Sequence, residues 1–186
     1  MPDIKNIING CLNGNRRDQE LLYRRHAAKL YAACLQYSGN DEEARDILQE
    51  GFIKIFENLV HYKYEGSFEG WMRRIIVNTA LEKYRSRHSL YRVDDIDQIP
   101  EQYAEPDNED YSGLEADDLM EIIRELPPKY RMVFNFFAIE GYSHKEISQM
   151  INISEGTSKS NLSRARFILQ RRVGSYTGLK KQVLNG

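Results

Sequence analysis

Apolar residues in this chain recur at intervals of three and four, the spacing that places them along one side of a helix. The clearest example runs from about Asp41 to Leu59, where one apolar stripe lies opposite an acidic and amide-rich side. Its members are Ala44, Ile47, Leu48, Phe52, Ile55, Phe56 and Leu59. Similar patterns predict further helices at 1–12, 18–36, 67–87, 114–126 and 128–139. An all-α fold is therefore expected.

The stretch 126–172 has the signals of two helices joined by a short turn. Ser143 followed by Glu146 forms a capping box, which marks the start of the first helix. The turn is placed at 152–153, and Ser154 is the candidate N-cap of a second helix that is expected to run to Arg172. This spacing predicts a helix-turn-helix.

The second of these helices has an apolar side and an outer side of different chemistry. The expected buried stripe contains Ser158, Leu162, Ala165 and Leu169, with Ile168 beside it. The outer side carries small, hydroxyl and cationic residues, namely Gly156, Lys159, Ser160, Ser163, Arg164 and Arg166. Such a surface fits the major groove of DNA, where Arg and Lys bind guanine edges. The alternative is an ordinary solvated face.

Acidic residues are concentrated in one segment. Eleven of the chain's 28 acidic residues lie between Val93 and Asp118, a segment without Lys or Arg, so 17 remain against 26 basic residues elsewhere. The net charge of −2 therefore hides two basic parts joined by an acidic connection. The segment 88–113 lacks periodicity and contains Pro100 and Pro106, which predicts a flexible linker.

Other classes of site have little support. Cys11 and Cys34 are isolated and the four histidines are scattered, so no metal site, cofactor or catalytic group is predicted. Isolated cysteines, with no signal peptide or long apolar segment, predict a cytoplasmic protein without membrane insertion.

The helix 41–59 carries a candidate protein-binding patch. Asp46, Gln49 and Glu50 are spaced at i, i+3 and i+4 and so share one turn of the surface. A partner bearing Arg could dock there through charge-assisted hydrogen bonds. A solvated charged face is the simpler alternative.

An aromatic loop, HYKYEGSF at 61–68, precedes a basic helix. From Trp71 to Arg92, one acidic residue accompanies six cationic ones, Arg73, Arg74, Lys83, Arg85, Arg87 and Arg92. Aromatic side chains beside a cationic stripe suit single-stranded nucleic acid, whose bases stack while its phosphates follow the charge. The alternative is that Tyr62, Tyr64 and Trp71 only pack in the core.

Three stretches together resemble the extracytoplasmic-function (ECF) sigma factors of bacterial RNA polymerase. DILQEGFIKIFENL at 46–59 is similar to the family's polymerase-binding helix, and FEGWMRRIIVNTALEKYRSR at 68–87 to its promoter-melting segment. LPPKYRMVF, EGYSHKEIS and GTSKSNLSRAR, the last at 156–166, resemble its −35 recognition domain. The resemblance implies sigma region 2 at 1–90, an acidic linker at 91–113, sigma region 4 at 114–174 and a tail at 175–186.

The resemblance also implies residue roles and partners. Core polymerase is expected at Asp46, Gln49 and Glu50. The single-stranded −10 element is expected at Tyr62, Tyr64, Trp71, Arg73, Arg74, Asn78 and Arg85. The duplex −35 element is expected at Gly156, Thr157, Lys159, Ser160, Ser163, Arg164 and Arg166. An anti-sigma factor is a further candidate partner, because the family commonly has one.

Some positions depart from the family pattern. Glu82 stands where an Asp is usual, and Ser158, Asn161 and Ser163 replace other side chains on the last long helix. The sequence thus predicts a sigma factor that directs promoter-specific initiation. The rival is an autonomous helix-turn-helix regulator with an N-terminal sensing or dimerisation domain. A nucleic-acid enzyme is disfavoured, because no carboxylate cluster is evident.

Overall fold

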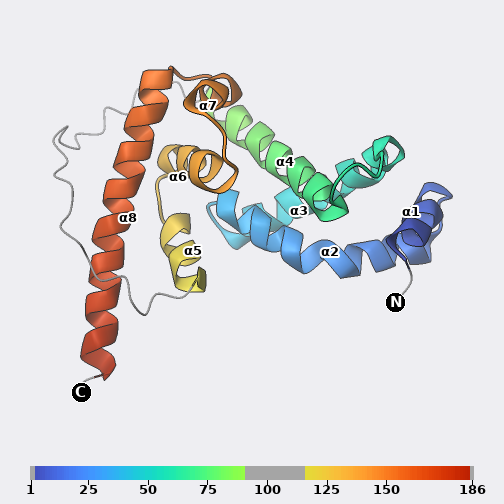
Figure 1. Ribbon diagram of the computed structural model, residues 1–186, viewed down its shortest axis with the longest axis horizontal. Coiled ribbons are helices and arrows are strands. Elements are labelled where there is room, and N and C mark those ends of the chain that lie inside the picture. The colour runs from blue at the N-terminus through green and yellow to red at the C-terminus, as the bar shows by residue number, and fades with distance from the viewer. Residues whose placement is uncertain (1–2, 91–115, 185–186) are drawn as a thin grey trace. The chain divides into compact units, whose positions relative to one another are not determined.

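The computed structural model describes residues 3–90 and 116–184, and these residues form helices and turns without any strand. The chain divides into two compact units, Met1–Arg87 and His88–Gly186 (Figure 1). The predicted all-α fold of two small helical bodies is confirmed. Of the segment 88–113 that was predicted to be a linker, residues 88–90 belong to the helix Phe68–Leu90, and the rest lies outside the described residues.

The N-terminal unit is built from four α-helices and one 3₁₀ turn. They are α1 (Ile4–Leu12), α2 (Arg16–Tyr37), α3 (Asp41–Asn58), the turn η1 (Leu59–His61) and α4 (Phe68–Leu90). The predicted stripe of α3 faces the core: Ala44, Ile47 and Ile55 are at most 1% exposed. Apolar side chains of α4, among them Met72 and Ile76, are buried as well. Hydrophobic burial of these faces is the main source of the unit's stability.

Short polar side chains set where these helices begin. The side chains of Asp3, Asn15 and Asn40 accept hydrogen bonds from backbone N–H groups in the first turns of α1, α2 and α3. Gly51 allows α3 and α4 to approach closely, since a Cβ there would lie 2.3 Å from the end of the Ile76 side chain. Cys11 and Cys34 are free, buried thiols, and burial raises the pKa of Cys34 to about 12.

The C-terminal unit contains α5 (Ala116–Arg124), α6 (Pro128–Phe134), the π-helical turn η2 (Asn135–Ile139), α7 (His144–Ile151) and α8 (Glu155–Leu184). Its core joins α5, α6 and α8 through Ile122, Leu126, Tyr130, Ala165 and Leu169. The buried Arg131 donates from Nη1 to the carbonyl oxygens of Arg124 and Leu126, which lie at and just beyond the end of α5.

The predicted helix-turn-helix is confirmed in detail. Ser143 and Glu146 form both halves of the capping box at the start of α7. Asn152 ends α7 in the left-handed conformation, with φ of 54°. Ser154 Oγ accepts a hydrogen bond from the N–H of Thr157 at 2.9 Å. The turn therefore lies where the capping signals placed it.

Two predictions about helices of the C-terminal unit are wrong. The helix expected to end at Arg172 continues through Leu184, because the two glycines that follow do not interrupt it. The helix predicted at 128–139 turns π-helical from Asn135, and the wider turn shifts the phase of the side chains. As a result Phe136 is 0% exposed, whereas Ala138 is exposed.

Candidate nucleic-acid and partner interfaces

The acidic patch lies on the surface of α3. Asp46 and Gln49 are exposed, and the Glu50 side chain is 41% exposed. The three side chains share one turn of the helix, as their spacing predicted. A partner can therefore contact all three residues together.

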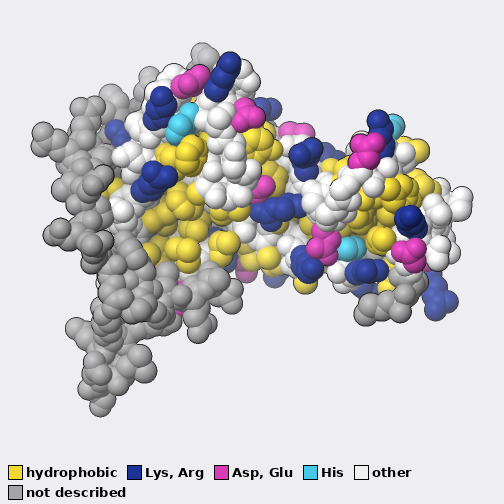
Figure 2. Space-filling view, in the orientation of Figure 1, with side chains coloured by type: hydrophobic (Ala, Val, Ile, Leu, Met, Phe, Trp, Pro, Cys, Tyr) yellow, Lys and Arg dark blue, Asp and Glu magenta, His cyan; other side chains and the backbone are white. Residues whose placement is uncertain are grey.

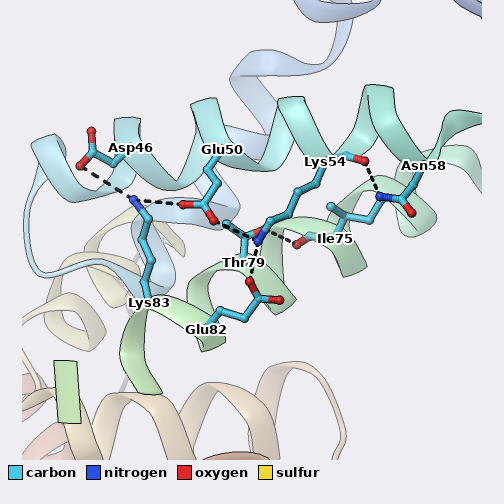
Figure 3. A network of polar contacts seen from close by, with 8 residues as sticks. All are labelled: Asp46, Glu50, Lys54, Asn58, Ile75, Thr79, Glu82 and Lys83. Carbon is cyan, nitrogen blue, oxygen red and sulfur yellow. Dashed lines mark hydrogen bonds and ion pairs between the residues drawn. The ribbon is translucent and has the colours of Figure 1, made fainter. Parts of the chain in front are cut away.

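The patch is tied to α4 by a chain of alternating charges, which we call the ion-pair chain (Asp46, Lys83, Glu50, Lys54 and Glu82; Figure 3). Lys83 Nζ lies 3.8 Å from Asp46 Oδ2 and 3.6 Å from Glu50 Oε2. Lys54 Nζ lies 3.0 Å from Glu50 Oε1 and 2.5 Å from Glu82 Oε2. The sequence alone did not point to Lys54 or Lys83 as partners of the patch.

The pKa values in the ion-pair chain favour its charged state. The hydrogen bond from Lys54 outweighs desolvation and lowers the pKa of Glu50. For Lys54, burial acts to lower the pKa, but hydrogen bonds and charge from Glu82 and Glu50 raise it overall. Both groups are consequently ionised at neutral pH. The patch keeps its negative charge, partly balanced by the protein's own lysines.

An apolar hollow lies next to the patch, between α2 and α3. Gln49 lines it together with Tyr23, Leu48, Phe52 and Phe56. Ile53 at its edge is 52% exposed, and Tyr23 is 43% exposed. Sequence analysis missed this surface, although Ile53 falls outside the apolar stripe of α3 and was a usable signal. Exposed apolar groups beside charged ones are typical of a protein-binding surface.

The aromatic loop forms a compact cluster at the start of α4. The ring of Tyr62 lies 5.0 Å from Tyr64, 4.9 Å from Phe68 and 5.3 Å from Trp71, measured between centroids. Phe68 is buried, Trp71 and Tyr62 are half-buried, and Tyr64 is exposed. Tyr64 also has a positive φ of 60°, a conformation that costs energy for a bulky residue. The cluster thus packs partly in the core while leaving ring surface available to a base.

Only some of the α4 residues predicted to bind nucleic acid lie on the outer side of the helix. Arg74, Asn78 and Arg85 are exposed along α4. Arg73 is half-buried and donates to Gln36 Oε1 on α2 at 2.9 Å. Glu82 lies between Asn78 and Arg85 on the same side of α4, about one turn from each. Its bond to Lys54 reduces the repulsion that it would exert on a phosphate.

The outer side of α8 is open as predicted. Gly156, Thr157, Lys159, Ser160, Ser163 and Arg166 are exposed, and Arg164 is half-buried. Asn161, in contrast, is 6% exposed and so belongs to the packed side. Figure 2 shows one face of the molecule, on which Lys and Arg side chains lie among acidic and hydrophobic ones.

One polar contact fixes the start of α8 against α7. His144 Nδ1 lies 2.9 Å from Ser158 Oγ in a hydrogen bond, and Ser158 is 0% exposed. The His144 ring stacks on the Phe137 ring with 4.6 Å between centroids, and the Arg166 guanidinium lies over the same Phe137 ring, 5.8 Å from its centroid. Burial, Lys159 and Arg166 lower the pKa of His144, so the ring is neutral at pH 7. The unusual Ser158 therefore has a partner that sequence analysis did not identify.

The described residues contain no grouping of His, Cys, Asp and Glu suited to holding a metal ion. Among the same residues, none of the helices has the length and hydropathy needed to span a membrane.

Comparison with known families matches each unit separately. The sigma-70 region 2 model matches residues 22–89, and the sigma-70 region 4 model matches residues 116–166. These stretches hold most of the predicted site residues, including the acidic patch, the aromatic loop and the first turns of α8.

Curated relatives extend across both units. The chain is 32% identical over 148 residues to the ECF RNA polymerase sigma factor SigE of Mycolicibacterium smegmatis, covering 78% of this chain and 57% of that relative. It is 29% identical over 155 residues to the ECF RNA polymerase sigma factor SigW of Bacillus subtilis, covering 78% and 83%.

Among solved structures, the sigma factor RpoE in complex with the anti-sigma factor NepR, from Bartonella quintana, is 21% identical with a TM-score of 0.46. That match covers 83% of this chain and 96% of the other. The two region models and the curated relatives carry the assignment. The chain belongs to the extracytoplasmic-function RNA polymerase sigma factors of the sigma-70 family.

Proposed function

We propose that this chain acts as a dissociable subunit of RNA polymerase. Its N-terminal unit binds core polymerase, and both of its units bind promoter DNA. The proposed domains are 1–90 for polymerase and the −10 element, 91–113 as linker, and 114–174 for the −35 element. In this role the protein works in the cytoplasm and is not an enzyme. It lends specificity to a reaction that polymerase catalyses.

The exposed patch of Asp46, Gln49 and Glu50 carries the polymerase-binding proposal. Two carboxylates and an amide on one helical turn match the bidentate geometry of Arg side chains. The adjoining apolar hollow, with Ile53 at its edge, adds surface whose burial would strengthen the contact. A docked polymerase segment would therefore carry both basic and aliphatic side chains.

The aromatic cluster and the outer side of α4 are proposed to hold the melted −10 strand. A base flipped out of the duplex loses its stacking, which costs a few kcal/mol. The rings of Tyr62, Tyr64 and Trp71 can return part of that free energy by stacking on the base. Arg74 and Arg85, exposed along the same helix, then lie where phosphates of the strand would pass.

The N-terminal half of α8 is proposed to enter the major groove at the −35 element. Gly156 and Ser160 are small enough for the helix to approach the base edges, and Lys159 and Arg164 can contact bases or phosphates. Each DNA contact alone would be weak. Because both units are joined to one polymerase, the second contact forms at high effective concentration once the first is made.

Retention of core polymerase tests the proposal. The full chain, immobilised, is expected to retain core polymerase and to support run-off transcription, while the Asp46→Ala, Gln49→Ala, Glu50→Ala triple variant loses most of the retained polymerase. A matched control replaces Glu42, Glu57 and Asn58, which are exposed on the same helix, with Ala. Equal retention by the two triple variants would contradict the role of the patch. Operator binding without any polymerase retention would instead support an autonomous regulator.

A further inference from the structure

His144 lies where the two helices of the helix-turn-helix meet. It is the first residue of α7, its ring is half-buried, and its Nδ1 lies 2.9 Å from the Ser158 hydroxyl of α8 in a hydrogen bond. Ser158 is followed directly by Lys159, one of the exposed cations proposed to contact the −35 element. The ring of His144 is therefore tied to the start of the surface that is proposed to bind duplex DNA.

Two exposed cations of α8 lie close to the His144 ring. The Arg166 guanidinium and the His144 ring both lie against Phe137, at 5.8 and 4.6 Å from its centroid. Lys159 and Arg166 both act on His144 through their charge, and Glu155 in the first turn of α8 acts in the opposite sense. From η2, the group in contact with His144 is the uncharged ring of Phe137. Three basic side chains from two helices thus gather at one place.

The charged neighbours of His144 on α7 itself are Lys145 and Glu146. Lys145 is exposed. The Glu146 carboxylate is already bonded in the capping box, because the N–H and the hydroxyl of Ser143 both donate to its Oε2, at 2.8 and 2.7 Å. The acidic group nearest in sequence is therefore occupied, and the surroundings of His144 carry more positive than negative charge.

Ser158 can stay bonded to His144 in either protonation state of the ring. A neutral ring with its proton on Nε2 accepts at Nδ1 from the Ser158 hydroxyl, whereas a protonated ring donates from Nδ1 to the Ser158 oxygen. Ser158 is 0% exposed, so a lost bond would leave a buried polar group unpaired. Because a hydroxyl can donate and accept, the ring can gain a proton without that cost.

The way in which such motifs bind DNA places α7 beside phosphates. In helix-turn-helix proteins the second helix lies in the major groove, and the first helix crosses the backbone. With α8 in the groove, α7 passes the backbone with His144 in its first turn. A phosphate bound by Lys159 and Arg166 would come close to the His144 ring, because both cations already act on that ring.

We propose that His144 is a further phosphate-binding residue of the −35 surface, and that its ring takes up a proton when a DNA phosphate arrives beside Lys159 and Arg166. This inference rests on the proposed role of α8 at the −35 element. The proton comes from the solvent and gives the ring one positive charge. In the complex, Nδ1–H donates to Ser158 and Nε2–H donates to a phosphate oxygen, which makes the contact a charge-assisted hydrogen bond.

The direction of the pH dependence follows from the charges. In the free protein, burial lowers the pKa of His144, and Lys159 and Arg166 lower it further, so the ring is neutral at pH 7. A phosphate offsets both cations and adds negative charge beside the ring, which raises the pKa in the complex. Binding therefore takes up a proton, and the affinity for DNA increases as the pH falls from 7.5 towards 6.0.

Titration of the full chain with a labelled −35 duplex at pH 7.5 and pH 6.0 tests the proposal. The wild type is expected to bind about three- to tenfold more tightly at pH 6.0, since uptake of one full proton changes affinity about tenfold per pH unit. His144→Gln keeps a side chain that can bond Ser158 but cannot be protonated, so it should lose most of this gain. Fluorescence anisotropy measures each affinity.

His61→Gln is the matched control, because His61 is an exposed histidine of the N-terminal unit. It should keep the pH dependence of the wild type. If His144→Gln weakens binding by the same factor at both pH values, His144 only positions α8 and the proposal is overturned. A wild-type affinity that does not increase at the lower pH would overturn it as well.

Nuclear magnetic resonance titration of the His144 ring in the wild type examines the same step without a substitution. The pKa of the ring should rise when the −35 duplex is bound, and an unchanged or lower pKa would contradict proton uptake. If the wild type binds the −35 duplex no better than a random duplex at either pH, the proposed role of α8 fails, and the role of His144 fails with it.

Discussion

The two units hold their functional surfaces in place by different means. In the N-terminal unit, charged side chains link one helix to another, as Lys83 and Lys54 do between α3 and α4. In the C-terminal unit, polar groups mainly satisfy backbone ends or buried partners, as with the capping box of Ser143 and the bond between His144 and Ser158. The first arrangement is exposed and exchangeable, whereas the second is local and fixed.

This difference fits what each unit is proposed to do. A surface that must accept polymerase and a melted strand in turn benefits from ion pairs that cost little to break. A helix that enters the major groove must present its side chains at a constant angle, and the capping bonds of α7 together with the part-buried bond between His144 and Ser158 provide that constancy. Substitutions at packed positions of the C-terminal unit should therefore change stability and DNA binding more than substitutions at the exposed ion pairs of the N-terminal unit.

Substitution of Phe136 is expected to have the largest effect on the stability of the C-terminal unit. Phe136→Ala is expected to destabilise the C-terminal unit by about 3–5 kcal/mol, because the ring is 0% exposed and leaves a cavity. Binding of duplex −35 DNA should fall accordingly, while Trp71 fluorescence continues to report a native N-terminal unit. Chemical denaturation followed by circular dichroism measures the loss.

Ala138 is the control for the phase of the π-helical turn. Ala138→Asp should change stability by less than about 0.5 kcal/mol, because the position is exposed. A large loss for Ala138→Asp with little effect of Phe136→Ala would mean that the regular helical phase is correct.

Arg164 tests how the fixed surface contacts DNA. Arg164→Ala should weaken binding to the −35 duplex by about 1–3 kcal/mol and relax sequence preference if the guanidinium contacts a base. Arg171→Ala removes the same charge farther along α8 and should affect specific and random duplexes alike. Titrations of both variants on both duplexes check the distinction. Equal losses on specific and random DNA for Arg164→Ala would assign it to a phosphate.

His26 is expected to have a smaller, pH-dependent effect on the stability of the N-terminal unit. Its side chain is buried, and burial lowers its pKa below the usual 6.5 despite the attraction of Glu69, with Arg25 and Lys29 adding to the decrease. As the pH falls below 6.5, the unfolded chain binds a proton that the folded protein does not, so stability decreases. Melting followed by Trp71 fluorescence should therefore give a lower Tm at pH 5.5 than at pH 7.5.

The variant His26→Leu separates this residue from other titrating groups. It should lose most of the difference in Tm between the two pH values, whatever its absolute stability. Glu69 also has a lowered pKa, mainly through its hydrogen bond with Lys29, but its contribution is lost only at lower pH. An unchanged pH dependence in His26→Leu would rule out His26 as its origin.

Local signals in the sequence predicted more than periodicity did. The capping box and Ser154 located α7 and α8, because caps depend on side chains only a few residues apart. The stripe of α3 was also correct. Periodicity failed at 135–139, because a π-helical turn changes the spacing of buried residues and the composition of this segment does not indicate one. The end of α8 was also missed, because no residue there marks the end of a helix.

The candidate sites could be located from the sequence but their internal contacts could not. Spacing grouped Asp46, Gln49 and Glu50 on one face because they lie on one helix. Lys83 is far from them along the chain, and its position depends on how α4 packs on α3. The same applies to His144 and Ser158, whose pairing follows from the geometry of the turn at Asn152.

The buried hydroxyl of Ser158 limits how promoter preference can be re-engineered. Ser158 lies between Thr157 and Lys159, two of the positions proposed to face DNA. The segment that recognises the DNA sequence therefore also contains the residue whose bond to His144 fixes the rotation of α8 about its axis. Transplanting residues 156–166 from a relative with an apolar residue at that position would leave His144 facing a hydrocarbon group. A portable recognition cassette in this protein must therefore include the histidine on the preceding helix.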